Sequence, residues 1–307
     1  MQPPDPQVDP PAHPSPTRAD FIRAASRERD VQGIRMRWEE SGEGPPVVLV
    51  HGIPTSPRLW RRVMPRVTGA RLLAWEMVGY GDSIPEGRDR DISVRAQAGY
   101  LLDWLDALQI DRAVLAGHDL GGGVVQIAAL RAPERCAGLL LTNAIGYDSW
   151  PIPSVKMLRA SGALVRHMPD AAVKTGVFRM LMARGHDDGD VADESLDQHF
   201  GPYARHGAGE ALMRQIDALD VHDTLDVADR LPTLANIPAR VVWGVADRFQ
   251  KPEHGERFAR DLGVAFERIE GGKHFTPEDH PERIAAALDS LIAEVAARSA
   301  STARRSH

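Results

Sequence analysis

The stretch VLAGHDLGGG, residues 114–123, constrains the fold of this chain more than any other segment. An apolar run typical of a buried strand ends at Gly117, and a helical pattern follows Gly121. Glycines at these two positions permit a strained turn in which larger side chains would clash with the adjacent strand and helix. The turn predicts that Asp119 projects over the sheet edge at a helix N-terminus, where the helix dipole favours a carboxylate. An N-cap role alone would also suit an aspartate, but strand, glycines and helix together favour a nucleophile.

Buried strands alternate with helical patterns on both sides of this turn. Uninterrupted apolar runs are typical of strands that are covered on both faces, and apolar residues at helical spacing predict the intervening helices. Such alternation implies right-handed crossovers and a mostly parallel sheet. We expect a hairpin over 26–42, strands at 45–52, 70–76, 111–119, 136–144, 239–247 and 265–270, and helices at 93–110, 122–133, 253–262 and 281–297.

The alternation stops between residues 149 and 226, where we find helical segments and no convincing buried strand. The simplest organisation is one α/β core interrupted by a helical cap, and no internal repeat is evident. The expected boundaries are a disordered proline-rich leader over 1–20, core over 21–148, cap over 149–226, core over 227–297 and a disordered tail over 298–307.

Composition excludes several classes of function. A formal net charge of −6 without a basic stripe argues against a nucleic-acid partner. No segment reaches eighteen consecutive apolar residues, so we expect no membrane span. The single cysteine, Cys136, lies at the start of an apolar run and fits a buried residue in a reducing compartment. The leader has seven prolines and no apolar h-region, so it does not resemble a signal peptide, and we expect a cytoplasmic protein.

The acidic stretch GHDDGDVADE, residues 185–194, raises the question of a metal site. It lacks the alternating ligands of a calcium loop, and no His-x-x-x-His pair lies nearby. We therefore expect a solvated loop of the cap. No metal and no cofactor are predicted for the chain.

Further candidate catalytic residues lie at predicted strand ends. Asp247 comes just after the strand VVWGVA, and His274 lies in a loop that follows Gly271-Gly272. The chain order of Asp119, Asp247 and His274 matches nucleophile, acid and base in one established triad order. The backbone N–H groups of Ile53, after the first buried strand, and of Leu120 are the expected pair of oxyanion donors.

These motifs resemble the α/β-hydrolase superfamily, within it the aspartate-nucleophile branch of epoxide hydrolases and haloalkane dehalogenases. The resemblance covers about residues 25–147 and 230–297, and it is carried by HGIP, GYGDS, GHDLGG, WGVAD and GGKHF. It implies an eight-stranded, mostly parallel sheet flanked by helices, with an inserted helical cap. One dehalogenase branch carries its acid after the strand that follows the nucleophile. Asn143 stands there in this chain, which supports Asp247 as the acid.

An aspartate nucleophile implies a particular chemistry. A carboxylate can displace a leaving group from an sp3 carbon, and the product is an alkyl ester of the enzyme. His274, oriented by Asp247, then activates a water that attacks the ester carbonyl of Asp119. The expected reaction is therefore cleavage of a C–O or carbon–halogen bond, and a hydrolase with esterase activity that uses Asp119 only structurally is an open alternative.

The leaving group distinguishes a haloalkane dehalogenase from an epoxide hydrolase. Dehalogenases usually bind halide with a Trp after the nucleophile and an Asn or a second Trp elsewhere, but Leu120 and Ile53 occupy the expected places here. Epoxide opening forms an alkoxide that benefits from an acid such as a phenol. Of the four tyrosines, Tyr147 and Tyr203 flank or enter the cap, so they are the candidate proton donors. Trp150, His167 and His206 are open substitutes.

The sequence therefore predicts an epoxide hydrolase that acts on a small hydrophobic epoxide with water. A haloalkane dehalogenase with the same triad is the alternative, and a non-catalytic ligand-binding protein is the remote one. Pro54, Trp150 and Phe275 are the candidate substrate contacts. Self-assembly through the cap helices stays open.

Overall fold

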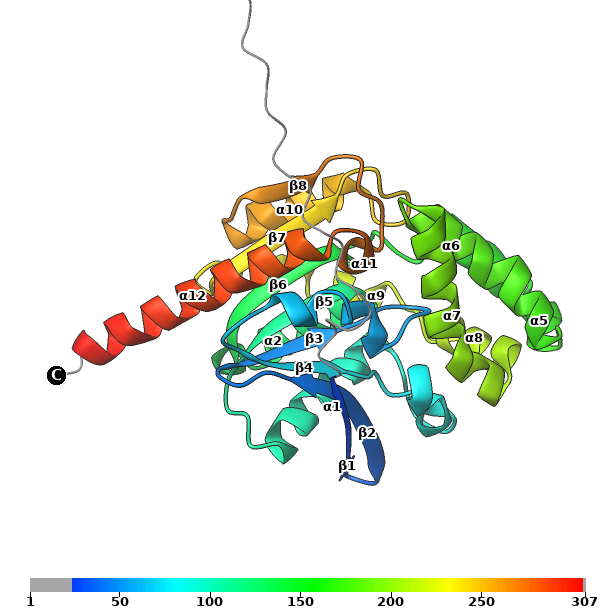
Figure 1. The fold of residues 1–307 in the computed structure, drawn as a ribbon, viewed down its shortest axis with the longest axis horizontal. Helices are drawn as coiled ribbons and strands as arrows, with labels where there is room; N and C mark the ends of the chain where they lie inside the picture. The colour runs from blue at the N-terminus through cyan, green and yellow to red at the C-terminus, as the bar shows by residue number, and fades with distance from the viewer. Residues whose placement is uncertain (1–23, 306–307) are drawn as a thin grey trace, which may run out of the picture.

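The computed structural model describes residues 24–305, in which eight strands form one sheet in the order β1-β2-β4-β3-β5-β6-β7-β8 (Figure 1). Strands β1 and β2 form an antiparallel hairpin, β2 pairs antiparallel with β4, and the remaining neighbours are parallel. The predicted fold class and strand arrangement are confirmed. The strands are β1 (Ala25–Val31), β2 (Ile34–Ser41), β3 (Pro46–Val50), β4 (Arg71–Trp75), β5 (Ala113–Asp119), β6 (Cys136–Ala144), β7 (Ala239–Gly244) and β8 (Phe266–Ile269).

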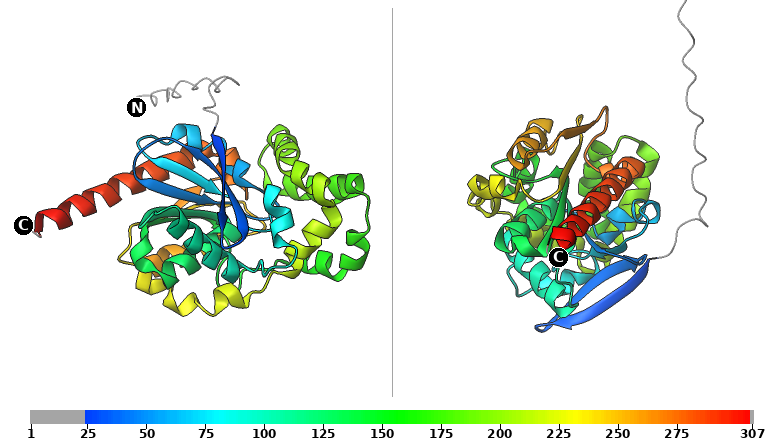
Figure 2. Two further views of the ribbon diagram at one scale, coloured as in Figure 1. Left: turned by 90° about the horizontal axis from the view of Figure 1, so that it is seen from below. Right: turned by 90° about the vertical axis from the view of Figure 1, so that its left-hand side faces the viewer.

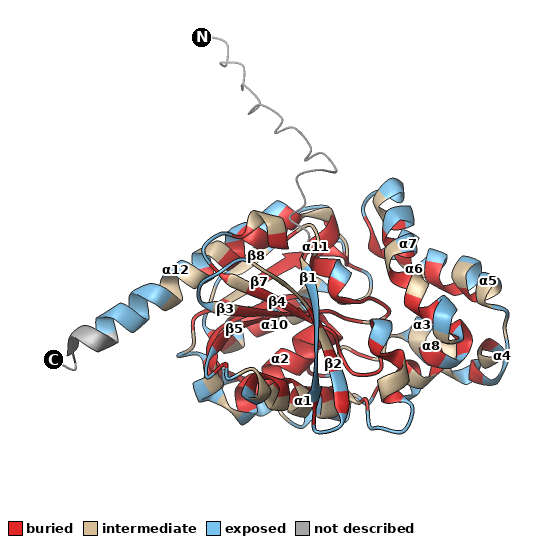
Figure 3. Cartoon of the chain, turned by 60° about the horizontal axis from the view of Figure 1, so that its bottom comes forward, coloured by how far each residue is buried: buried red, intermediate tan, exposed pale blue. Residues whose placement is uncertain are grey.

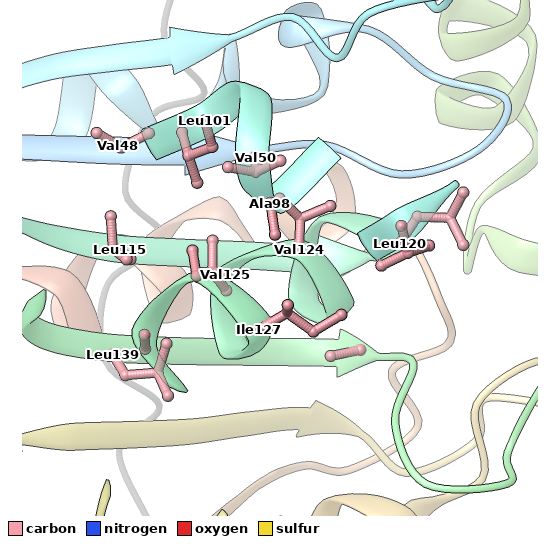
Figure 4. Packing of buried hydrophobic residues seen from close by; sticks show 14 of the residues in the cluster. Val48, Val50, Ala98, Leu101, Leu115, Leu120, Val124, Val125, Ile127 and Leu139 are labelled. Atoms are coloured by element: carbon pink, nitrogen blue, oxygen red, sulfur yellow. The ribbon is translucent and has the colours of Figure 1, made fainter. Parts of the chain in front are cut away.

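Two hydrophobic layers cover the sheet. Because side chains alternate along a strand, Val48 and Val50 of β3 face the layer formed with α1, α2 and α10, whereas Val47 and Leu49 face the layer formed with α12. Figure 4 shows the first layer, in which Val124 of α2 packs between the sheet and α1. The core helices are α1 (Val94–Ala107), α2 (Leu120–Arg131), α10 (Pro252–Leu262), the short α11 (Thr276–Asp279) and α12 (Pro281–Arg305).

Local signals explain the limits of these helices. The Ser93 hydroxyl accepts the N–H of Ala96 and so caps α1, as the sequence predicted for Ser93 or Asp91.

The single cysteine, Cys136, is fully buried at the start of β6, and burial raises the pKa of its thiol to about 12. Short 3-10 segments are Pro57–Trp60, Met64–Arg66, Gly81–Gly87, Pro133–Arg135 and Ala228–Leu234.

Helices replace strands between β6 and β7, and most of them lie together beside the carboxyl edge of the sheet (Figures 1 and 3). The last of them, α9, packs against α1 and α2 of the core, although the predicted cap extended to residue 226. The segment comprises α3 (Pro153–Ala160), α4 (Gly162–Arg166), α5 (Asp170–Val173), a π turn (Lys174–Phe178), α6 (Arg179–Gly185), α7 (Gly189–His206), α8 (Ala208–Asp217) and α9 (His222–Leu225).

The C-terminal segment differs from the sequence prediction, which expected a disordered tail over 298–307. Helix α12 continues to Arg305 and projects away from the core (Figure 2), so residues 298–305 are helical rather than unstructured. This extension has no apolar face to bury, but alanine and arginine are strong helix formers that can continue an existing helix. The predicted leader over 1–20 lies outside the described residues. Among helices within 24–305, none is both long and apolar enough to cross a bilayer.

Candidate active site

Asp119 lies at the turn between β5 and α2, with a backbone φ of 50° and ψ of −121°. A positive φ is strained for a residue with a Cβ atom, and such strain persists only where the surroundings fix the backbone. Gly52 lies directly against the carboxylate, because a Cβ atom there would be 2.4 Å from Asp119 Oδ2. The strand, the turn and the neighbouring loop therefore hold one buried carboxylate at the carboxyl edge of the sheet.

The turn leaves no room for a side chain at Gly117, which can be tested by substitution. A Cβ atom at this position would lie 2.4 Å from the Gly121 carbonyl oxygen and 2.6 Å from Gly122 Cα, both backbone atoms that cannot give way cheaply. We expect Gly117→Ala to lower the free energy of unfolding by about 3 kcal/mol or more. Gly189→Ala is the matched control, since nothing lies within 4 Å of its Cβ position. Urea unfolding of both variants checks this, and equal stability would contradict the tight turn.

Two backbone N–H groups hold the Asp119 carboxylate. The N–H of Ile53 donates to Oδ2 over 3.0 Å, and the N–H of Leu120 also bonds to the carboxylate. Burial raises the pKa of Asp119, opposed by the charge of His274 and by these two donors. The structure thus brings together the two groups that the sequence proposed as oxyanion donors, and both point at an oxygen of Asp119 itself.

His274 and Asp247 form a hydrogen-bonded pair behind Asp119. His274 Nδ1 lies 2.8 Å from Asp247 Oδ2, and His274 Nε2 lies 4.0 Å from Asp119 Oδ1. Burial alone would lower the pKa of His274, but the charge and hydrogen bond of Asp247 and the charge of Asp119 outweigh it and raise this pKa. Since 4.0 Å exceeds hydrogen-bond distance, Asp119 Oδ1 is not hydrogen-bonded to His274.

Two supporting residues were not assigned roles from the sequence. Asn143 Nδ2 donates to Asp247 Oδ2 over 2.7 Å, while its Oδ1 accepts the N–H of Gly244 over 3.0 Å. His118 Nε2 lies 2.9 Å from the carbonyl oxygen of His274. Burial lowers the pKa of His118 well below its usual value, so the neutral ring donates this bond. Asn143 thus supports the carboxylate, and His118 supports the backbone of the histidine.

Replacing Asn143 tests this support. We expect Asn143→Ala to cost about 1–3 kcal/mol of stability, because the N–H of Gly244 and one oxygen of Asp247 lose their partner inside the core. Turnover should also fall, since Asp247 loses a bond that orients it. Asn236→Ala, at an exposed position, is the control. Thermal unfolding and initial rates measure both effects, and an unchanged Asn143 variant would contradict the assignment.

An apolar cavity of about 530 Å³ opens in front of Asp119 and His274. Ile53, Leu120 and all three predicted substrate contacts line it, namely Pro54, Trp150 and Phe275. Met157 of α3 and Met180 of α6 contribute to its wall and are 73% and 56% exposed, so they lie where the cavity meets solvent. Other apolar lining residues come from the segment inserted between β6 and β7: Val155, Leu158, Val177, Leu181, Leu212, Ile216 and Leu219.

Neither predicted proton donor contributes to this lining, which corrects the sequence-based expectation. The Tyr147 hydroxyl donates to Asp261 over 2.8 Å, and the Tyr203 hydroxyl donates to Gln215 over 2.6 Å. Both side chains are fully buried. Burial, together with Asp261, raises the pKa of Tyr147, and burial raises that of Tyr203 despite its bond to Gln215. Position in the chain placed both tyrosines near the cap, but their hydroxyls serve structural contacts elsewhere.

The substitutes also lack a free donor at the cavity. The Trp150 ring nitrogen donates to the Thr224 hydroxyl over 2.7 Å, and neither His167 nor His206 lines the cavity. The remaining polar side chains of the lining, apart from Asp119 and His274, are Ser154, Ser161, Arg184 and Gln250. Among the described residues, no group of three His, Cys, Asp or Glu side chains has the geometry of a metal site.

The chain is similar to known proteins over most of its length. Residues 45–281 match the family model of the alpha/beta hydrolase fold. A haloalkane dehalogenase of Mesorhizobium japonicum is 27% identical over 288 residues, which cover 85% of this chain and 88% of that protein. A solved alpha/beta hydrolase fold protein from Burkholderia ambifaria is 28% identical, with a TM-score of 0.78 over 85% of this chain and 96% of that one. The epoxide hydrolase CorEH, 22% identical, shares the fold with a TM-score of 0.72 over 88% of this chain and 99% of that one.

The chain therefore belongs to the alpha/beta hydrolase fold family. The family match and the similarity to a haloalkane dehalogenase support a hydrolase, while the likeness to CorEH shows the fold alone.

Proposed function

We propose that this protein hydrolyses small apolar alkyl halides through an ester on Asp119. The observation that supports this proposal is the carboxylate itself: Asp119 lines an apolar cavity, its Oδ2 accepts the N–H of Ile53, and its Oδ1 lies 4.0 Å from His274 Nε2. A carboxylate in this position can attack an sp3 carbon. Oδ1 forms a bond to that carbon, and the carbon–halogen bond breaks with its electron pair going to the halide.

The second step regenerates the enzyme. Water attacks Asp119 Cγ and gives a proton to His274 Nε2, while charge develops on Oδ2 beside the N–H groups of Ile53 and Leu120. The tetrahedral intermediate then expels the alkoxide, which takes the proton from His274 and leaves as the alcohol. Asp119 finally releases one proton to solvent, so alkyl halide and water give alcohol, halide and a proton.

Formation of the ester also prepares the base. The negative charge of Asp119 is one cause of the raised pKa of His274. Esterification removes this charge, so the pKa of His274 falls when the residue must accept a proton. Asp247 remains charged and keeps the ring oriented.

Among the described residues, the cavity lining lacks the Trp that usually binds halide, since Leu120 follows Asp119, and it also lacks a phenol; it favours halide as the leaving group because halide needs no proton. An epoxide oxygen needs a proton as the ring opens, whereas halide is a weak base that leaves without one. Apart from Asp119 and His274, the polar side chains of the lining are those of Ser154, Ser161, Gln250 and Arg184, and neither a hydroxyl nor an amide is acidic enough to give up a proton near neutral pH. The similarity to a haloalkane dehalogenase points the same way. Epoxide hydrolysis, which the sequence predicted, becomes the alternative because neither Tyr147 nor Tyr203 lines the cavity as a proton donor.

A product assay separates the two leaving groups. Purified protein is incubated with 1,2-dibromoethane and with cyclohexene oxide in separate reactions, and bromide and diol are quantified. We expect bromide release and little diol. Diol without bromide would overturn the choice of leaving group and point to a proton donor outside the groups named above, while leaving the role of Asp119 open to its own test.

A further inference from the structure

The last residue of α6 and the two residues after it, Gly185–Asp187, are hydrogen-bonded directly to the backbone that carries His274. The carbonyl oxygen of Gly185 accepts the N–H of His274 over 2.9 Å and the N–H of Phe275 over 3.1 Å. The N–H of Lys273 donates to Asp187 Oδ1 over 2.7 Å. Three consecutive N–H groups, at 273–275, therefore have their acceptors in one short segment of the inserted helices.

His186 fixes the far side of the same loop. Its ring is buried, and Nδ1 lies 2.9 Å from Asp279 Oδ1 while Nε2 lies 3.2 Å from Glu278 Oε2. Burial alone would lower the pKa of His186, but the hydrogen bond to Asp279 and the charges of both carboxylates raise it to about 9, which favours the charged ring. The ring also stacks on Phe275 with 4.5 Å between centroids. This places His186 against the residue next to His274.

Asp187 binds a second part of the loop as well. Its Oδ2 lies 2.6 Å from His280 Nε2, and its N–H donates to Asp279 Oδ2 over 3.2 Å. Since Oδ1 accepts the N–H of Lys273, the Asp187 carboxylate contacts both Lys273, just before His274, and His280, just after α11. The sequence predicted a solvated loop over 185–194, and residues 187–190 are exposed, but His186 is buried and the Asp187 side chain itself is 26% exposed.

The buried Glu278 extends this contact to α7. Its carboxylate accepts the Ser195 hydroxyl over 2.6 Å, lies 3.3 Å from His199 Nε2 and pairs with Arg61 of the core. Burial would raise the pKa of Glu278, but Arg61 and the two histidines hold it well below its usual range. The loop that carries His274 is thus held between the core and the inserted helices by charged groups.

We propose that His186 and Asp187 are positioning residues that hold His274 in place for hydrolysis of the Asp119 ester. This inference rests on the proposed function. The main supports of Asp119, the N–H groups of Ile53 and Leu120, belong to the core and not to this segment. Loosening the segment should therefore affect the step that uses His274 and leave the attack by Asp119 nearly unchanged.

This separation predicts a kinetic signature. When only ester hydrolysis slows, kcat and KM fall together and kcat/KM stays constant, because kcat/KM reports the steps up to ester formation. A general loss of folded enzyme or a distorted cavity would instead lower kcat/KM. The signature therefore distinguishes positioning of His274 from mere attachment of the inserted helices.

The test uses Asp187→Ala and, as a second variant, His186→Gln. Rapid-quench mixing with 1,2-dibromoethane followed by intact-mass measurement gives the rates at which the ester forms and decays. We expect decay to slow by about tenfold or more, since small displacements of a catalytic group cost one to two orders of magnitude. We expect ester formation to change by less than about threefold, and the ester to become the main species at steady state.

Two further variants serve as controls. Asp188→Ala also removes one negative charge, at the adjacent position. The Asp188 side chain caps α7, where it accepts the N–H groups of Asp190 and Val191. This variant should leave ester decay unchanged. Asp187→Asn keeps an oxygen that can accept the N–H of Lys273, and we expect it to restore most of the decay rate. Wild-type decay in both Asp187→Ala and His186→Gln, or equal slowing of formation and decay, would overturn the inference.

The proposed function can fail separately from this inference. If the His274→Gln variant forms no ester on Asp119, the proposed function is wrong. If that variant accumulates the ester while Asp187→Ala and His186→Gln turn over like the wild type, only the positioning role is wrong.

Discussion

Replacing Asp119 with asparagine is expected to abolish turnover while leaving the fold intact. The amide has no anionic oxygen to attack an sp3 carbon, so we expect kcat to fall by about 10⁴-fold or more. The side chain has almost the same shape, its oxygen can still accept the N–H of Ile53, and asparagine tolerates the positive φ found at this position. Initial rates of bromide release, together with thermal unfolding, measure the two halves of this prediction.

Two controls keep the result decisive. Asparagine can deamidate back to aspartate, so intact mass should be checked during the assay, and Asp119→Ala provides a second variant that cannot revert. Retention of more than about one hundredth of wild-type activity in both variants would contradict a nucleophilic Asp119. Ligand binding that survives in Asp119→Asn, with no turnover by the wild type either, would instead favour a binding protein.

Isotope labelling tests the same residue in the wild-type protein. In a single turnover in water enriched in heavy oxygen, the alcohol should carry the original oxygen of Asp119, and the label should appear in the enzyme. This follows because water attacks Cγ of Asp119 and not the substrate carbon. Label in the first alcohol formed would mean direct attack of water on the substrate.

The sequence predicted the parts of the site that depend on local chain geometry. Gly117 and the strand before it determine the turn at Asp119, so the position of the carboxylate follows from a few adjacent residues. Asp247 and His274 follow strand ends, and parallel strands bring their carboxyl ends to one edge of a sheet. The structure accordingly places His274 between the two aspartates.

The incorrect predictions concern contacts between side chains that meet only in the folded chain. Whether a tyrosine hydroxyl faces a cavity depends on what else it meets, and Tyr147 meets Asp261, which is more than a hundred residues away. The same limit applies to His186, whose neighbours in sequence are acidic and polar, although its ring is buried against α11. A run of charges has no periodicity that would reveal such a contact, so only the folded chain distinguishes a buried network from a solvated loop.

Asn143 illustrates an intermediate case. It lies near the end of β6, at the position where one dehalogenase branch carries its acid, and that observation directed attention to Asp247. The pairing of its amide with both Asp247 and the N–H of Gly244 could not be predicted, because it depends on the register of β6 against β7. The sequence therefore indicated the location of this residue but not its contacts.

Replacing His274 with glutamine is expected to trap the alkyl ester. Asp119 keeps both N–H donors and can still attack, so one equivalent of bromide should be released per enzyme, followed by turnover slowed by about 10³-fold. Intact mass should rise by the mass of the bound alkyl group, and peptide mapping should locate it on Asp119.

The matched control is His222→Gln, because His222 is an exposed histidine of α9 whose ion pair with Asp226 lies at the surface. This variant should turn over like the wild type and accumulate no ester. A double variant that adds Asp119→Asn to His274→Gln should release no bromide and gain no mass, since the attacking oxygen is gone. Sustained turnover by His274→Gln would show that another group activates water. Loss of the bromide burst would mean that His274 is needed before the ester forms, and the division of labour between Asp119 and His274 derived from their 4.0 Å separation would then be wrong.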